Sequence, residues 1–138
     1  MTKFASSIAL LAVMLPTLAR PVAAHHSVSA EYDTSKPITF TGKVTRVEWM
    51  NPHIYTNIEA RDEAGKTVVF RVEGGAPNSL FRQGWRPDTL KPGDTVTVSG
   101  WRSKNPASFN VGLATIRNAE GKVIFITPGR NAYDEAQQ

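Results

Sequence analysis

Apolar and polar residues alternate over most of the chain from residue 38 to residue 126, and this pattern predicts β-strands with one buried face. In the first strand the apolar positions change parity, from Phe40 and Val44 to Val47 and Trp49. A one-residue change of this kind predicts a β-bulge near Thr45 and Arg46 in one long, bent strand. The predicted strands cover residues 38–49, 54–60, 67–73, 95–101, 111–117 and 123–126.

The segments between these strands carry turn and helix signals. Asp62–Gly65 and Asn118–Gly121 are typical hairpin turns. Pro77 suits the first turn of a helix and Gly84 suits the position after its end, which predicts a short helix over 76–83. The fold class is therefore mainly β: a small antiparallel five- or six-stranded barrel of the oligonucleotide/oligosaccharide-binding (OB) type, with one short helix between strands 3 and 4. A plain β-sandwich is the alternative.

The first residues read as a targeting segment. A short basic start is followed by an apolar run over 8–18, and Val22-Ala23-Ala24 provides small residues for signal peptidase. The run is too short for a membrane-spanning helix. We expect a signal peptide at 1–24, an N-terminal arm at 25–36, the barrel at 37–127 and a flexible tail at 128–138, with no membrane anchor after cleavage.

The amino-acid composition excludes several kinds of functional site. The chain has no cysteine, which excludes disulfides, thiolate metal sites and a cysteine nucleophile. The formal net charge is +4, and removal of the leader takes away Lys3 and Arg20 and lowers it by two. A nearly balanced charge gives little attraction for nucleic acid. No catalytic set stands out, so enzyme activity is disfavoured, apart from oxygen chemistry at a bound copper. The serines near the histidines, Ser27 and Ser29, have no nucleophile context, and turns are expected to contain Asp33, Asp62, Asp88 and Asp94.

Two of the three histidines, His25 and His26, directly follow the predicted cleavage site. Cleavage after Ala24 leaves the α-amine and imidazole of His25 free to chelate one metal ion, with a second imidazole from His26 or His53. Cleavage after Ala23 leaves an N-terminus with histidine at position three, which wraps a square-planar ion with four of its own nitrogens. Both sets suit Cu(II), the one cofactor these residues suggest, although adjacent histidines also occur as a simple polar junction.

The segment 49–55 offers a different candidate site. His53 lies where strands 1 and 2 join, a common place for ligand contacts in OB-like barrels. The alternative function is therefore an OB-like module that binds an envelope saccharide, peptide or protein partner without metal, and it predicts an exposed aromatic patch. Structural roles in the core and in turns compete with this interpretation. The candidate ligand-binding residues are Trp49, Asn51, Tyr55, Trp101 and Arg102.

Several motifs together resemble a known family. They are His25-His26-Ser27, Glu48-Trp49-Met50-Asn51-Pro52-His53, Glu73-Gly74-Gly75-Ala76-Pro77-Asn78, Arg82-Gln83-Gly84-Trp85 and the segment 93–100. The chain resembles a family of small exported bacterial proteins known as a domain of unknown function, over nearly all of the expected mature chain. The resemblance implies a periplasmic location in a Gram-negative bacterium and implies no activity.

Overall fold

A computed structural model describes residues 28–127 and Arg130. Six strands and two short helices make up this part of the chain. None of its helices is long and apolar enough to cross a membrane. In chain order the elements are α1 (Val28–Glu31), β1 (Tyr32–Glu48), β2 (Tyr55–Arg61), β3 (Thr67–Glu73), α2 (Pro77–Arg82), β4 (Thr95–Ser103), β5 (Asn110–Asn118) and β6 (Val123–Ile126).

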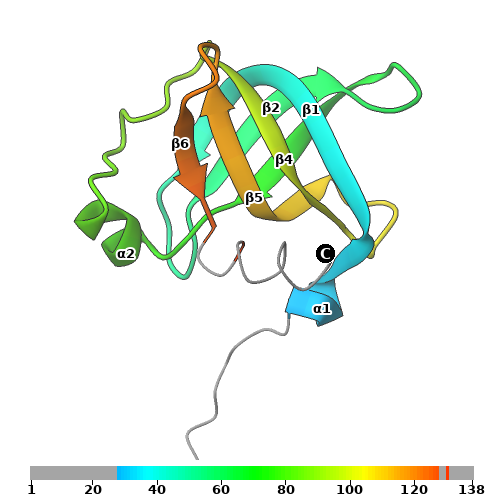
Figure 1. Cartoon of the computed structure of the whole chain (residues 1–138), viewed down its shortest axis with the longest axis horizontal. Helices are drawn as coiled ribbons and strands as arrows, with labels where there is room; N and C mark the ends of the chain where they lie inside the picture. Colours follow the sequence, from blue (N-terminus) through cyan, green and yellow to red (C-terminus); the bar gives the residue numbers. More distant parts are fainter. Residues whose placement is uncertain (1–27, 128–129, 131–138) are drawn as a thin grey trace, which may run out of the picture.

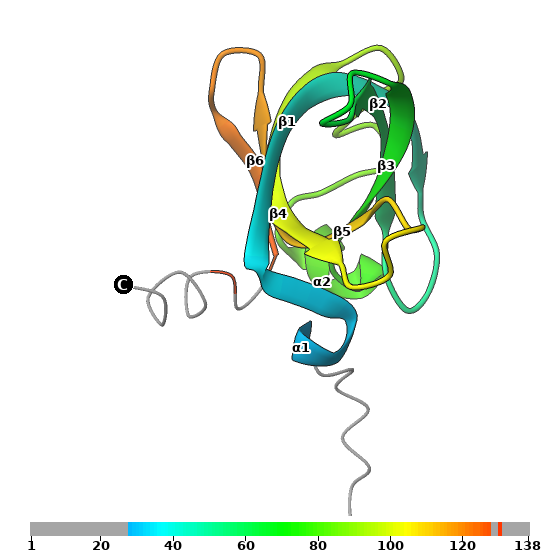
Figure 2. The same cartoon turned by 90° about the vertical axis from the view of Figure 1, so that its right-hand side faces the viewer.

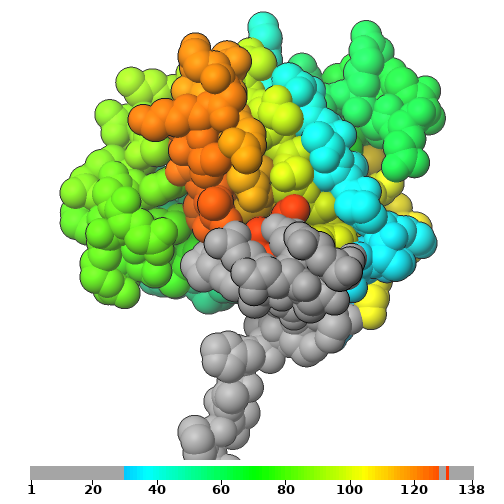
Figure 3. All heavy atoms as spheres, viewed as in Figure 1, coloured from blue at the N-terminus to red at the C-terminus, as the bar shows by residue number. Residues whose placement is uncertain are grey.

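The six strands form one sheet that closes into a ring. Its order is β3-β2-β1-β4-β5-β6, and an additional parallel pairing between β3 and β5 closes the ring of the first five strands. Figures 1 and 2 show this barrel, with β6 beside β5 outside the closed ring. In the space-filling view the side chains of β1, β4, β5 and β6 follow one another across one face (Figure 3). The predicted fold class, with a short helix between strands 3 and 4, is confirmed.

The long first strand can serve two neighbours because it bends. It pairs with β4 along its first part and with β2 along its second part, and the register with β2 shifts between Val44 and Arg46. This shift is the predicted β-bulge. Nearby, Gly42 lets the strands approach closely, since a Cβ there would clash with the Glu59 carbonyl and come within 2.8 Å of the Ala60 Cβ.

The interior of the ring is filled by the alternating apolar residues of β1 to β5, and Phe125 of β6 joins the same core cluster. Phe40 and Phe70 stack at 4.1 Å between ring centroids, and Leu80 of α2 is fully buried beneath one end. Trp85 covers the same end, where its indole Nε1 donates to the Ile124 carbonyl at 3.1 Å. Figures 1 and 2 place α1, α2 and the β1–β2 turn at this end, and the β2–β3 hairpin at the opposite end.

The observed strand bounds differ from the prediction mainly at the start of β1. This strand begins at Tyr32, inside the segment expected to be an irregular arm, because Tyr32 pairs with Ser103 of β4. The Lys104 amide also donates to the Glu31 carbonyl at 2.9 Å. Local alternation is absent over 33–36, so only this long-range pairing reveals the strand. The expected signal peptide, His25, His26 and nearly all of the expected tail lie outside the described residues.

Gly42→Ala tests the close approach of β1 and β2. We expect a loss of about 3 kcal/mol in the free energy of unfolding, because the new Cβ would clash with the Glu59 carbonyl oxygen and crowd the side chains of Ala60 and Ile58. Gly121→Ala is the matched control: its φ of 79° is strained for alanine, but nothing lies near the added Cβ, so about 1 kcal/mol is expected. Urea unfolding monitored by circular dichroism measures both, and equal losses would contradict the packing account.

Candidate functional site

His53 is held against the end of β3 by the ladder between β2 and β3. Tyr55 lies opposite Glu73, and the backbone pairing continues one step further, with Gly74 N donating to the Ile54 carbonyl at 2.8 Å. His53 is therefore the diagonal neighbour of Glu73 on the outer face, within reach of its side chain. The His53 Nδ1 lies 2.5 Å from Glu73 Oε1, and the two side chains are 33% and 18% exposed.

The other carboxylate oxygen of Glu73 accepts a hydrogen bond from the Tyr32 hydroxyl. Tyr32 comes from the start of β1, and its ring is buried in a small cluster with Trp101 and Leu113. The ring lies so close to Gly112 that a Cβ there would clash with it. Tyr32, Glu73 and His53 thus form one hydrogen-bonded chain that joins the first described strand to the β1–β2 turn.

This hydrogen-bonded chain lies at the end of the ring where the described part of the protein begins. α1 immediately precedes Tyr32, and α1 and the β1–β2 turn share one end of the ring (Figures 1 and 2). His26 is two residues before the first residue of α1.

Burial is the largest influence on the pKa values of Tyr32 and Tyr55. Removal from water raises the pKa of the Tyr32 phenol, and the hydrogen bond to Glu73 raises it further. Burial also raises the pKa of Tyr55, followed by the negative charge of Glu73, while the guanidinium of Arg71 acts in the opposite direction. Both tyrosines are therefore neutral near pH 7, and Tyr32 acts as a hydrogen-bond donor to Glu73.

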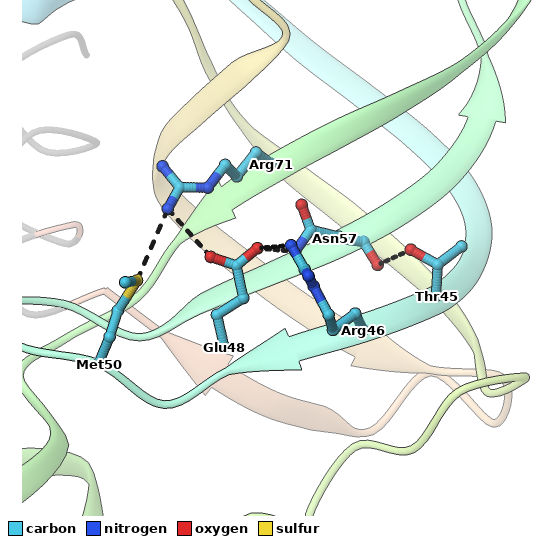
Figure 4. A network of polar contacts seen from close by, with 6 residues as sticks. All are labelled: Thr45, Arg46, Glu48, Met50, Asn57 and Arg71. Carbon is cyan, nitrogen blue, oxygen red and sulfur yellow. Dashed lines mark hydrogen bonds and ion pairs between the residues drawn. The ribbon is translucent and has the colours of Figure 1, made fainter.

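A second polar network covers the outer face of β1, β2 and β3 (Figure 4). Its centre is Glu48, which accepts a hydrogen bond from Asn57 Nδ2 at 2.7 Å. Arg46 and Arg71 pair with the same carboxylate at 2.5 and 3.2 Å. The hydrogen bond from Asn57, then those from Arg71 and Arg46, lower the pKa of Glu48 against the opposing effect of burial. The network fixes the strand ends that carry His53 and Glu73.

The aromatic residues predicted to bind a ligand do not form one exposed patch. Trp49 packs half-buried against the main core, and its Nε1 has no hydrogen-bond partner among the described residues. The guanidinium of Arg71 lies 3.4 Å from the centroid of the Tyr55 ring and covers it. Trp101 is buried beneath Arg130, with 4.1 Å between guanidinium and ring centroid.

The polar residues of that prediction are also separated. Asn51 is exposed in the β1–β2 turn, where the Asn51–Pro52 peptide bond is cis. Arg102 lies on β4 with its guanidinium 5.7 Å from the Phe109 ring centroid. Of the predicted metal ligands, His53 has a defined environment, while His25 and His26 lie outside the described residues.

Sequence reasoning assigned no role to Tyr32 or Glu73. The sequence pattern could have indicated Glu73, because this residue ends a predicted strand on its outward face, two positions away from Arg71. No local pattern indicates a role for Tyr32, because its partners come from β3 and β5, far along the chain. Within the described residues, no three histidines, aspartates or glutamates lie close enough to hold a metal ion.

Comparison with known proteins gives a family but no activity. A family model described as "Family of unknown function (DUF6152)" matches residues 13–112, well over half of the chain. The chain belongs to this family. No curated protein and no solved structure matches it. The DUF6152 match spans β1 to β4 and the first residues of β5, and so includes Tyr32, His53 and Glu73.

Glu48→Gln tests the polar network through its pH dependence. A carboxyl group whose pKa is lowered by folding stabilises the protein above its unfolded pKa, near 4.5, and loses this contribution as the pH falls through the folded value. At pH 7 we expect the variant to be less stable by about 1–2 kcal/mol. The difference disappears at low pH, where protonated glutamate resembles glutamine.

Thermal unfolding between pH 2 and pH 7 measures this difference. Glu59→Gln is the matched control, because Glu59 is an exposed glutamate on the same outer surface. We expect its stability to stay within about 0.5 kcal/mol of the wild type at each pH. A Glu48→Gln deficit that stays constant down to pH 2 would contradict the assignment to the charged carboxylate.

Proposed function

We propose that this protein is exported to the periplasm and binds Cu(II) through its processed N-terminal histidines, His25 and His26, together with His53. The observation that carries the proposal is the hydrogen-bonded chain Tyr32–Glu73–His53. It anchors the start of β1, a few residues after His26, beside the one histidine of the barrel. The proposal thus gives a physical role to all three histidines of the chain.

The donor set supports copper over other divalent ions. The α-amine and neutral imidazoles are nitrogen ligands, and the order of affinities for such ligands peaks at Cu(II). The absence of cysteine from the sequence removes the thiolates that structural zinc sites commonly use. A periplasmic address is supported by the leader-like sequence over 1–24, whose removal creates the free α-amine.

The metal-free alternative, a saccharide or peptide site on aromatic residues, has less support. Stacking on a sugar needs an accessible ring face, whereas Trp101 is buried and Tyr55 is covered by Arg71. The one strongly exposed aromatic side chain among the described residues is Phe81, which carries the guanidinium of Arg86 at 3.8 Å.

Cu(II) titration of the protein purified from periplasm tests the proposed function. N-terminal sequencing should find a start at His25 or Ala24, and isothermal titration should find one tightly bound equivalent. The matched control carries Gly-Ser before the same N-terminus, and its affinity should fall by at least about tenfold because the α-amine is displaced. A protein that keeps its leader, or affinity that is indifferent to the extension, would overturn the proposal.

A further inference from the structure

Leu113 of β5 has a backbone conformation that leucine rarely adopts. Its φ angle is 47°, and among the residues that the structure describes it is the one residue other than glycine with a positive φ. A bulky side chain is strained in this region, so the surrounding structure must hold it there. Strained residues of this kind cluster at functional sites, where the strain positions a group that binds or reacts.

The strained residue lies beside a break in the pairing of β4 with β5. The register of this pairing shifts between Ser99 and Trp101, which marks a β-bulge or irregularity in the ladder. There the carbonyl oxygens of Ser99 and Leu113 converge on one nitrogen, Nη1 of Arg130, at 3.1 and 2.5 Å. Carbonyl oxygens only accept hydrogen bonds, so the two together suit a positively charged donor.

An aromatic ring contacts the same guanidinium. The distance from the Arg130 guanidinium to the centroid of the Trp101 ring is 4.1 Å, and tryptophan is the aromatic side chain that attracts a cation most strongly. Trp101 is held in place by the small buried cluster that it forms with Tyr32 and Leu113. One ring face and two carbonyl oxygens thus match the flat face and the N–H groups of a guanidinium, a combination that an ammonium group does not offer.

We propose that these groups of Ser99, Trp101 and Leu113 form an arginine-binding site. Arg130 occupies this site as an internal ligand, and the arginine side chain of a partner peptide takes its place. The site is separate from the histidines and does not depend on copper binding.

Exchange of the internal ligand follows from the place of Arg130 in the fold. β6 ends at Ile126, so Arg130 lies outside the sheet. The chain is fixed to β5 just before it, where the Thr127 backbone N–H donates to the Ala114 carbonyl at 2.9 Å. The Arg130 backbone N–H in turn donates to the Thr127 carbonyl at 3.0 Å. Release of the Arg130 side chain therefore opens the site and breaks none of the strand pairings of the barrel.

A second arginine, Arg86, makes similar contacts in a different setting. Its Nη1 donates to the carbonyls of Phe81 and Trp85 at 3.0 and 2.7 Å, and its guanidinium lies 3.8 Å from the Phe81 ring centroid. These partners are close to Arg86 in the sequence, and Phe81 is 53% exposed whereas Trp101 is 4% exposed. Arg86 thus stabilises its own turn and provides a control for the site that β4 and β5 form.

Arg130→Ala tests whether the site binds an arginine that is not part of the chain. N-acetyl-arginine amide is titrated into the variant and into the wild type, and the NMR amide signals of Trp101 and Leu113 report binding. We expect the variant to bind at least about tenfold more tightly than the wild type, because Arg130 no longer competes. N-acetyl-lysine amide should bind the variant at least about tenfold more weakly, since an ammonium group lacks the planar set of donors.

Two further variants serve as controls. Arg86→Ala removes an arginine that also contacts an aromatic ring and two carbonyls, and it should bind the arginine compound no better than the wild type does. The double variant Arg130→Ala with Trp101→Leu lacks the ring face, and its binding should be lost. Circular dichroism establishes that each variant is folded before titration.

The outcomes decide between an exchangeable site and a fixed structural contact. A folded Arg130→Ala variant that binds no arginine compound, or that binds the lysine compound equally well, overturns the proposal. If this variant does not fold, the wild type provides the test. A high concentration of the arginine compound should then shift the amide signals of Trp101 and Leu113 by displacing Arg130, and signals that do not move overturn the proposal.

Discussion

The hydrogen bond from Tyr32 to Glu73 joins the start of β1 to the end of β3, two strands that do not pair with each other in the sheet. It crosses the seam where β3 meets β5, the pairing that closes the ring. The ring of Tyr32 fits there because residue 112 is glycine, and its apolar atoms are buried against Trp101 and Leu113. The start of β1, the closure of the barrel and the orientation of His53 therefore depend on one another.

This arrangement explains how a small barrel holds the His53 side chain in one orientation at the end of the ring. Glu73 ends a strand whose interior residues, Phe70 and Val72, are fully buried, so its backbone position is fixed by the core. The polar contacts of Glu48 link the end of β1 to Asn57 of β2 and Arg71 of β3. His53 thus lies in a turn but is oriented by two rigid strands, a combination that suits binding sites.

Local periodicity was sufficient to predict the elements of the barrel. The bounds of β3 and β6 agree with the alternation to the residue, and the change of parity after Val44 located the bulge. Each of these features follows from the types of residues that are neighbours in the sequence. The start of β1 does not follow from local sequence, because Tyr32 is a strand residue only through its pairing with Ser103.

The site was predictable only in part for the same reason. His53 was identifiable as a rare residue at a strand junction, whereas its partner depends on the register of β2 against β3 and on a contact across the seam. Exposure was harder still to infer. Tyr55 and Trp101 were candidates for binding by residue type, and the structure covers both with arginine side chains supplied from elsewhere in the chain.

The central proposal is that Cu(II) bound by the processed N-terminus is also bound by His53. Paramagnetic broadening of amide signals in the NMR spectrum of the processed protein, upon addition of substoichiometric Cu(II), tests it most directly. The account predicts selective loss of the signals of Tyr32, His53 and Gly74, while Gly65 and Gly121 in the hairpins at the far end stay sharp. Bound copper that leaves the signals of His53 and Gly74 sharp would contradict it.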